Sequence, residues 1–245
     1  MKQFFAAEHI VTLAVVVATI SGLVVAARMR PGAWTLVAAR ILAVVLVVNE
    51  LSWLGSVIAA GQWNVQWALP LNLCDSACFV AAAALWTRRS LLVELTWFWG
   101  IAGTAQGLLT PEIGTWHFPQ YNYIQYFVAH GGIVMSAFFL VVGLGIRPRK
   151  GAIVRVEALT LAYTAVAGAI DLMVHGNYMF LRNKPGVASV LDIFGPWPFY
   201  IVGATGLAVV FFTLLDLAFW RSRSKRPVRD ARPISTVRSR NASRS

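Results

Sequence analysis

Charged residues are scarce in this sequence. Asp, Glu, Lys and Arg make up 13% of the 245 residues, whereas a soluble domain normally carries about 25%. Hydrophobic residues make up 58%, the mean hydropathy is +0.66, and the apolar residues fall in long blocks. Too few charges are present to cover the surface of a soluble domain of this length, so the composition indicates a membrane protein.

Cysteine and the common ligand motifs are also sparse. The only two cysteines, Cys74 and Cys78, lie four residues apart in one apolar segment, where helical geometry does not favour a disulfide bond. The sequence contains no CxxC or HxxxH motif, no nucleotide-binding glycine motif and no convincing internal repeat. We therefore expect no metal, no cofactor, no disulfide framework and no soluble domain.

Seven segments are long enough to form membrane-spanning helices, which need about 20 apolar residues each. They predict an all-α fold, a bundle of seven transmembrane helices formed by residues 1–220. The third and fourth segments are the shortest and carry the most polar residues. The predicted spans are 8–27, 34–59, 69–87, 90–109, 123–146, 154–179 and 197–220.

The basic residues follow alternate helices. Seventeen of the 21 Lys and Arg residues fall on one side of the predicted bundle, whereas Lys2, Arg182 and Lys184 fall on the other, and Arg40 lies inside the second helix. Because positive charge marks the cytoplasmic side, we expect the N-terminus outside and the C-terminus in the cytoplasm. The seventeen are Arg28, Arg30, Arg88, Arg89, Arg147, Arg149, Lys150, Arg155 and nine residues after Trp220.

The segment 221–245 has no apolar periodicity and carries much of the net charge of +11. It is predicted to be a disordered cytoplasmic tail that rests on anionic lipid headgroups. Because this tail and the basic loops account for the charge, we expect no nucleic-acid partner. The sequence gives no oligomeric state.

Polar residues from five predicted helices fall at one depth, in the outer third to half of the membrane. Ionisable groups at such depth are usually paired or functional, so we expect them to meet in the bundle interior or in a wet cavity. The predicted cluster comprises Glu50, Asn72, Cys74, Asp75, Gln106, His130, Asp171, His175 and Asn177.

Spacing refines two parts of this cluster. Asp171 and His175 lie i, i+4 on one predicted helix and so share a face. Because Glu50 shares their depth, at least one carboxylate–imidazole contact between different helices is expected. That pair would serve either a function or the joining of two helices. Pro70 is predicted to begin the third helix, which places Cys74 in its first turns, near free backbone N–H groups that favour a thiolate. Asn72 would be an additional donor to an oxyanion.

Three chemistries could use these side chains. Cys74 and His130 suit nucleophilic acyl transfer, in which the imidazole takes the thiol proton and the sulfur attacks an ester carbonyl; Asp171 or Glu50 would orient a histidine. Cys74, His130, His175 and a carboxylate could hold a metal, but their spacing is unspecific. A transporter or receptor could bind a solute where a helix is broken. Cys78 is expected to be a packed thiol.

Five blocks carry a resemblance: LPLNLCDSACF, GTAQGLLTPEI, FPQYNYIQYFVAHGGIV, HGNYMFLRNKP and GPWPFY. Together they resemble the YwaF-like integral membrane proteins of bacteria, related to the animal transmembrane protein 164 family. The resemblance implies seven helices in a bacterial plasma membrane and a phospholipid acyltransferase activity that uses Cys74 and His130. Asn72 departs from the usual LPLHLC block, which has a histidine there.

The loop between the sixth and seventh predicted helices is basic. Arg182 and Lys184 lie on the same side of the membrane as the polar cluster and could receive a phosphate headgroup. The alternative is an ordinary connecting loop with interfacial aromatic residues. The predicted partner is therefore a membrane lipid, with a phospholipid of the outer leaflet as substrate.

Overall fold

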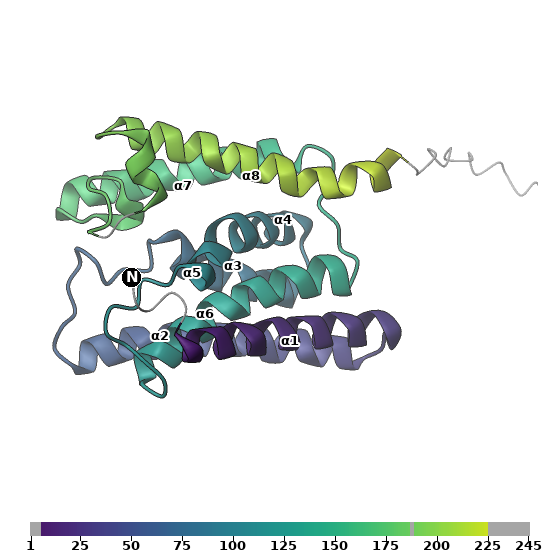
Figure 1. The fold of residues 1–245 in the computed structure, drawn as a ribbon. Helices are drawn as coiled ribbons and strands as arrows, with labels where there is room; N and C mark the ends of the chain where they lie inside the picture. The colour runs from purple at the N-terminus through teal and green to yellow at the C-terminus, as the bar shows by residue number, and fades with distance from the viewer. Residues whose placement is uncertain (1–5, 187–188, 225–245) are drawn as a thin grey trace, which may run out of the picture.

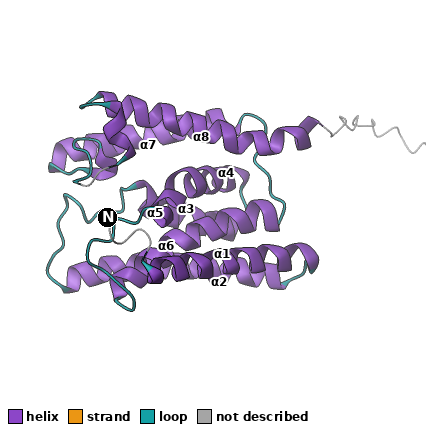
Figure 2. Cartoon of the chain, in the orientation of Figure 1, coloured by secondary structure: helices purple, strands orange, loops and turns teal. Residues whose placement is uncertain are grey.

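The computed structural model describes residues 6–186 and 189–224, and every regular element in these ranges is a helix (Figure 2). The helices are α1 (Ala7–Met29), α2 (Trp34–Ala59), α3 (Leu73–Thr87), α4 (Ser90–Phe98), the π-helix η1 (Trp99–Thr104), α5 (Ala105–Leu109), α6 (Tyr121–Phe138), the π-helix η2 (Phe139–Gly143), α7 (Ala152–Val174), the short 3₁₀ turns η3 (Tyr178–Phe180) and η4 (Val190–Phe194), and α8 (Phe199–Ser224).

These elements form seven rods, as predicted, because α4, η1 and α5 run on without a break and so do α6 and η2. Five rods are long and apolar enough to cross a membrane. The protein is therefore a helical membrane protein. The third and fourth predicted spans differ from the rest: α3 has only 15 residues, and the stretch from Ser90 to Leu109 is interrupted by a π-helix.

The centre of the bundle is formed by α3, α4 and α6. Within the most apolar stretch of each long helix, 61% of residues are buried in α6 but only 6% in α1 and in α8. Figure 1 shows α7 and α8 as a pair along one side of the central helices, with α1 and α2 along the opposite side. Small residues allow this close packing; Leu46 of α2, for example, lies directly against Gly132 of α6.

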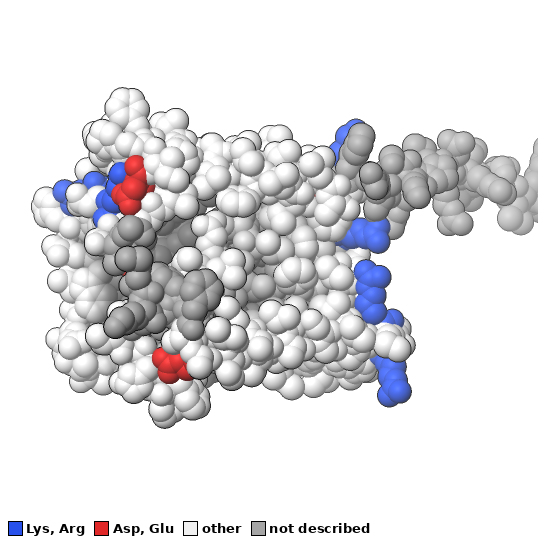
Figure 3. Space-filling view, viewed as in Figure 1, with Lys and Arg blue, Asp and Glu red and all other residues white. Residues whose placement is uncertain are grey.

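Successive rods alternate in direction, so the connections after α1, α3 and η2 lie at one end of the bundle, which we call the basic end (Figure 1). Figure 3 shows basic side chains gathered there, an uncharged flank, and a smaller mixed group of charges at the opposite end. The predicted grouping of basic loops on one side is thus confirmed for the described residues. Which end faces the cytoplasm stays a prediction.

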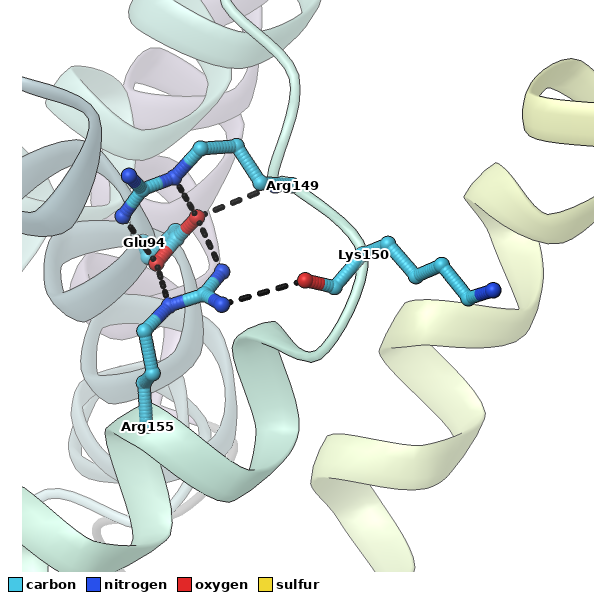
Figure 4. Close-up of polar contacts among 4 residues, drawn as sticks. All are labelled: Glu94, Arg149, Lys150 and Arg155. Atoms are coloured by element: carbon cyan, nitrogen blue, oxygen red, sulfur yellow. Dashed lines mark hydrogen bonds and ion pairs between the residues drawn. The ribbon is translucent and has the colours of Figure 1, made fainter.

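A buried carboxylate ties the basic end together (Figure 4). The Glu94 side chain is fully buried and accepts two hydrogen bonds from the Arg149 guanidinium, at 2.8 and 3.2 Å, and two from Arg155, at 2.9 and 3.1 Å. The Arg149 amide also donates to Glu94 at 3.0 Å. This set of hydrogen bonds, which we call the fork, joins α4 to the start of α7. It gives the buried carboxylate the oppositely charged partners that a buried charge requires.

Several predicted boundaries need correction. The third helix begins at Leu73 instead of Leu69, so Pro70 precedes it; the sixth ends at Val174, before His175; and α8 runs from Phe199 to Ser224. The predicted tail 221–245 lies outside the described residues beyond Ser224.

Candidate functional site

The polar residues at the start of α3 mostly build its N-terminus. Asn72 is the residue before the first helical turn; its side-chain Nδ2 donates to Asp75 Oδ2 at 3.0 Å, and its side-chain Oδ1 accepts from the Met179 amide at 3.2 Å. These contacts fasten the helix start to the loop after α7. One of the two N–H groups of Asn72 is already committed to Asp75, which weakens the predicted oxyanion role.

The next polar residue, Ser76, links α3 to α7. Its hydroxyl donates to the Pro70 carbonyl at 2.9 Å and lies 2.5 Å from the Tyr163 hydroxyl, which in turn contacts the Leu71 carbonyl at 2.9 Å. Polar residues in this stretch of α3 are therefore explained largely by satisfied backbone groups at a helix end that lies inside the protein.

Cys74, in contrast, faces the interrupted fourth rod. Its half-buried side chain interacts with Thr104, the last residue of the π-helix η1. Thr104 is fully buried, and its hydroxyl donates to the Trp99 carbonyl at 3.3 Å, five residues earlier. A π-bulge inside an α-helix frequently marks a functional site, and this one presents its C-terminal end to the thiol.

His130 of α6 is held in a defined orientation. Its Nδ1 atom lies 2.9 Å from the Tyr126 carbonyl, and a carbonyl can only accept, so Nδ1 carries the proton. In the neutral imidazole Nε2 then has a free lone pair. This atom has no hydrogen-bond partner among the described residues. The ring also stacks on Tyr126, with centroids 4.0 Å apart.

Gly107 of α5 forms the other wall of the histidine site. A Cβ atom built there would meet His130 Cδ2 at 2.7 Å and Nε2 at 3.0 Å, so only glycine leaves room for the imidazole. The Tyr126 hydroxyl donates to the Gly107 carbonyl at 2.9 Å. The stacked rings of Tyr126 and His130 thus lie directly against the C-terminal turn of the interrupted rod.

Tyr126 is near both Cys74 and His130, the predicted nucleophile and base. It stacks on His130 and lies in the neighbourhood of Cys74. The described structure contains no hydrogen bond between Cys74 and His130 themselves. Both side chains lie near the region formed by Thr104, Gly107 and Tyr126, but they are not hydrogen-bonded to each other.

Carboxylates line the other side of the α3 start. Glu50 of α2 is buried, interacts with Cys78 and is close enough to Asp75 for their charges to interact. A cavity of about 20 Å³, room for one water molecule, separates Glu50 from Pro70 and Ala68. Cys78 is 1% exposed, which suits the predicted packed thiol.

The predicted pairing of Asp171 with His175 is wrong. His175 ends α7 in the left-handed conformation, at φ 57°, and its side chain is exposed, so the two residues no longer share a helix face. Asp171 is buried and accepts instead from the Tyr178 amide at 2.8 Å. Neither Glu50 nor Asp171 contacts an imidazole in the described structure, so the expected carboxylate–imidazole contact is absent there.

Two further members of the predicted cluster lie apart from it. The Gln106 side chain is exposed and its amide donates to the carbonyl of Ala102 at 2.5 Å. Asn177 organises its own loop by accepting from the amides of Arg182 and Asn183 and donating to the carbonyl of Asn183. Both residues satisfy local backbone groups and do not line the site.

The basic loop after α7 is partly neutralised. Lys184 forms an ion pair with Asp192 at 3.3 Å and lies over the Tyr200 ring, while Arg182 donates to the Gly176 carbonyl. Arg182 remains exposed. A headgroup at this loop would therefore meet Arg182 more readily than Lys184.

Comparison with known proteins identifies one matching family. The model of the TMEM164 family matches residues 4–216, which is most of the chain. The chain belongs to the TMEM164 family. No curated protein and no solved structure matches it. The family match covers the first six rods, most of α8, and both Cys74 and His130.

Within this TMEM164-family chain the site contains residues that sequence reasoning missed. Thr104 interacts with the thiol, and Gly107 and Tyr126 lie against the imidazole; the only sequence signal for them was the glycine spacing in GTAQG. Among the described residues, no group of three or more His, Cys, Asp or Glu side chains could hold a metal ion.

Proposed function

We propose that this protein is a membrane-embedded acyl-transfer or lipid-ester hydrolysing enzyme, with Cys74 as nucleophile and His130 as base, acting on phospholipid in the outer leaflet of a bacterial plasma membrane. The observation that carries the proposal is the environment of His130. Its Nδ1 proton is fixed by a backbone carbonyl, its Nε2 lone pair is uncommitted, and Tyr126 stacks on it while lying close to Cys74.

The proposed step uses these atoms directly. His130 Nε2 accepts the proton of the Cys74 thiol while the sulfur attacks the ester carbonyl of the lipid. The tetrahedral intermediate collapses, the lysophospholipid oxygen leaves and takes the proton from the imidazolium, and the acyl chain remains on Cys74 as a thioester. Water or the hydroxyl of an acceptor lipid then attacks the thioester, and His130 again takes and returns the proton.

Cys74 and His130 are not hydrogen-bonded in this structure, so the scheme requires the two side chains to approach each other when substrate binds. Catalytic hydrogen bonds are often long in structures without substrate and tighten when substrate is bound. The Cys74 side chain is half-buried at the very start of α3, where a change of rotamer alters its reach. A bound ester carbonyl beside Thr104 and Tyr126 would lie between the two reacting groups.

The alternative is a transporter or receptor that binds a solute where the fourth rod is interrupted. The π-helix beside Cys74 favours this reading as a place for a ligand, without any chemical step. In that case the thiol would be dispensable, because Thr104 and Tyr126 could supply the polar contacts. The two functions therefore differ in their dependence on Cys74.

The test is an acyl-transfer assay with the full chain in vesicles that contain a phospholipid with a labelled acyl chain and an unlabelled lysophospholipid. Cys74→Ser is expected to lower the rate at least about 100-fold. Cys78→Ser, at a packed thiol on the same helix, is the matched control and should keep most of the activity. Lipid profiles of cells with the wild-type gene and with each variant would identify the substrate.

Wild-type transfer that Cys74→Ser leaves unchanged would exclude the covalent mechanism. No transfer or hydrolysis of any phospholipid by the wild-type chain, in vesicles or in cells, would instead favour the transporter or receptor.

A further inference from the structure

A groove runs between α2 and α3 on the outer surface of the bundle. Its volume is about 370 Å³, and alanines form much of its lining, which leaves the recess between the larger side chains. Val44 and Val48 on its rim are exposed, so the groove opens toward membrane hydrocarbon. The lining residues are Ala43, Val44, Val47, Val48, Phe79, Ala82, Ala83 and Trp86.

Arg40 stands at the basic end of this groove. It precedes Ala43 and Val44 by three and four residues, so it lies on the same face of α2. Its guanidinium lies 5.4 Å from the ring centroid of Trp86, which also lines the groove. Arg40 is exposed and forms no ion pair with a carboxylate among the described residues.

An arginine at the lipid boundary without a counter-charge is costly, and the Trp86 ring offsets only part of that cost. A lipid phosphate would supply the missing charge, because a guanidinium binds phosphate oxygens through two parallel hydrogen bonds. We propose that the groove between α2 and α3 binds an anionic phospholipid, with the phosphate on Arg40 and one acyl chain along the alanine-lined recess.

The dimensions agree with this occupant. Arg40 is six residues into α2, about 9 Å from the helix start at 1.5 Å per residue, and an arginine can reach the headgroup level from that depth. The groove then continues from Trp86 to Phe79, seven residues or about 10 Å along α3 by the same rise. A phosphate at Arg40 therefore places the upper part of an acyl chain in the groove.

Charge decides which phospholipid is retained. Lipid tails are as apolar as the groove, so its lining gives no hydrophobic preference for a bound chain over the bilayer. Selection must come from the headgroup, and Arg88 and Arg89 follow Trp86 by two and three residues at this end of the groove. Their positive potential favours a lipid with net negative charge, such as phosphatidylglycerol, over a zwitterionic one.

This site is independent of the proposed function. Arg40 and Trp86 lie toward the basic end, whereas Cys74 begins α3 at the opposite end. A lipid with its phosphate on Arg40 has its ester groups near that phosphate, far from the thiol. It would be a bound, non-reacting lipid that fills the groove between α2 and α3.

Native mass spectrometry of the full chain, released from nanodiscs with equal phosphatidylglycerol and phosphatidylcholine, tests this inference. We expect one retained phosphatidylglycerol, and retention about tenfold lower in Arg40→Gln and in Ala83→Leu, which fills the groove. The matched controls are Arg30→Gln, an exposed arginine at the same end, and Ala165→Leu, an exposed alanine on α7. Neither should change retention, and thermal unfolding of each variant verifies that it is folded.

Three results would overturn the inference. Equal retention of the two lipids with no effect of Arg40→Gln would mean that only non-specific boundary lipid is present. Loss of retention in Arg30→Gln equal to that in Arg40→Gln would mean that general charge at the basic end, and not the groove, holds the lipid. Displacement by millimolar inorganic phosphate would point to an anion site without the acyl chain and would also count against it.

Discussion

The imidazole of His130 stacks on the ring of Tyr126, with centroids 4.0 Å apart and planes 21° apart. The same tyrosine fixes the imidazole through its backbone carbonyl and lies near Cys74. A single residue of α6 therefore sets both the tautomer and the position of the proposed base. Gly107 lies against the Cδ2–Nε2 edge of the ring, so the histidine has little room to move toward α5.

Gly107→Ala should disturb the site without unfolding the protein. The new Cβ would lie 2.7 Å from His130 Cδ2, so the imidazole must shift, while glycine-to-alanine in a helix by itself gains up to about 1 kcal/mol. We expect acyl transfer to fall at least about tenfold with little change in the thermal unfolding midpoint. Gly55→Ala, where a Cβ meets nothing within 4 Å, is the control. Equal activity of the two variants would show that the ring position does not matter.

Cys74 should react with a membrane-permeant, lipid-like alkylating probe in preference to Cys78. The first thiol is half-buried at a helix start, and the second is 1% exposed. His130→Ala should slow the labelling of Cys74, because the base that accepts its proton is removed. Mass spectrometry of the labelled peptides measures both rates. Equal labelling of the two cysteines, unaffected by His130→Ala, would show that Cys74 is a packed thiol and not an activated nucleophile.

Glu94→Gln should destabilise the basic end. The substitution leaves two guanidiniums facing a neutral amide; because the Arg149 and Arg155 side chains are 51% and 36% exposed, we expect a loss of about 2–3 kcal/mol, below the range for fully buried pairs. Asp192→Asn, which breaks an exposed ion pair, should cost far less. Denaturant unfolding in detergent compares the two, and similar midpoints would contradict a structural role for the fork.

Asp192 should make the loop after α7 sensitive to acid. The Ser189 amide, at 2.8 Å, and then Lys184 lower the pKa of its carboxyl. Because the folded pKa lies below the unfolded one, of about 3.9, the stabilisation is complete above that value and is lost as the pH falls through the folded pKa. Hydrogen exchange of the Ser189 amide, expressed relative to its intrinsic rate at each pH, should stay constant from pH 8 to about pH 5 and rise below about pH 4. Asp192→Asn should abolish this step, and a rise near neutral pH would contradict the assignment.

The orientation of the bundle can be tested in cells. The basic end carries the connections after α1, α3 and η2, so a reporter fused after Ser245 should be cytoplasmic and a tag at Met1 should be external. Protease or antibody access to each tag in intact cells measures this. Access to the C-terminal reporter from outside would reverse the orientation and place the Cys74 end in the other leaflet.

Composition and periodicity determined the fold class, because the bilayer permits few structures. Backbone groups in hydrocarbon must be satisfied within a helix, so long apolar blocks imply rods, and the alternate basic loops imply that those rods reverse direction. This reasoning anticipated seven rods and the common end of Arg28, Arg88 and Arg147. The family resemblance, carried by five short blocks, was likewise present in the sequence alone.

Only the tertiary structure decided which polar residues meet. Depth along a helix says nothing of the direction in which a side chain points, so Asp171 and His175 were grouped although the chain leaves the helix at His175, in the left-handed conformation. The π-helix before Ala105 turns Thr104 and Gly107 toward α3 and α6, and that extra residue in the turn leaves no pattern in the sequence. Packing between rods brought Cys74, Tyr126 and His130 into one region, because close contacts such as Gly107 against the imidazole form only when the rods are assembled.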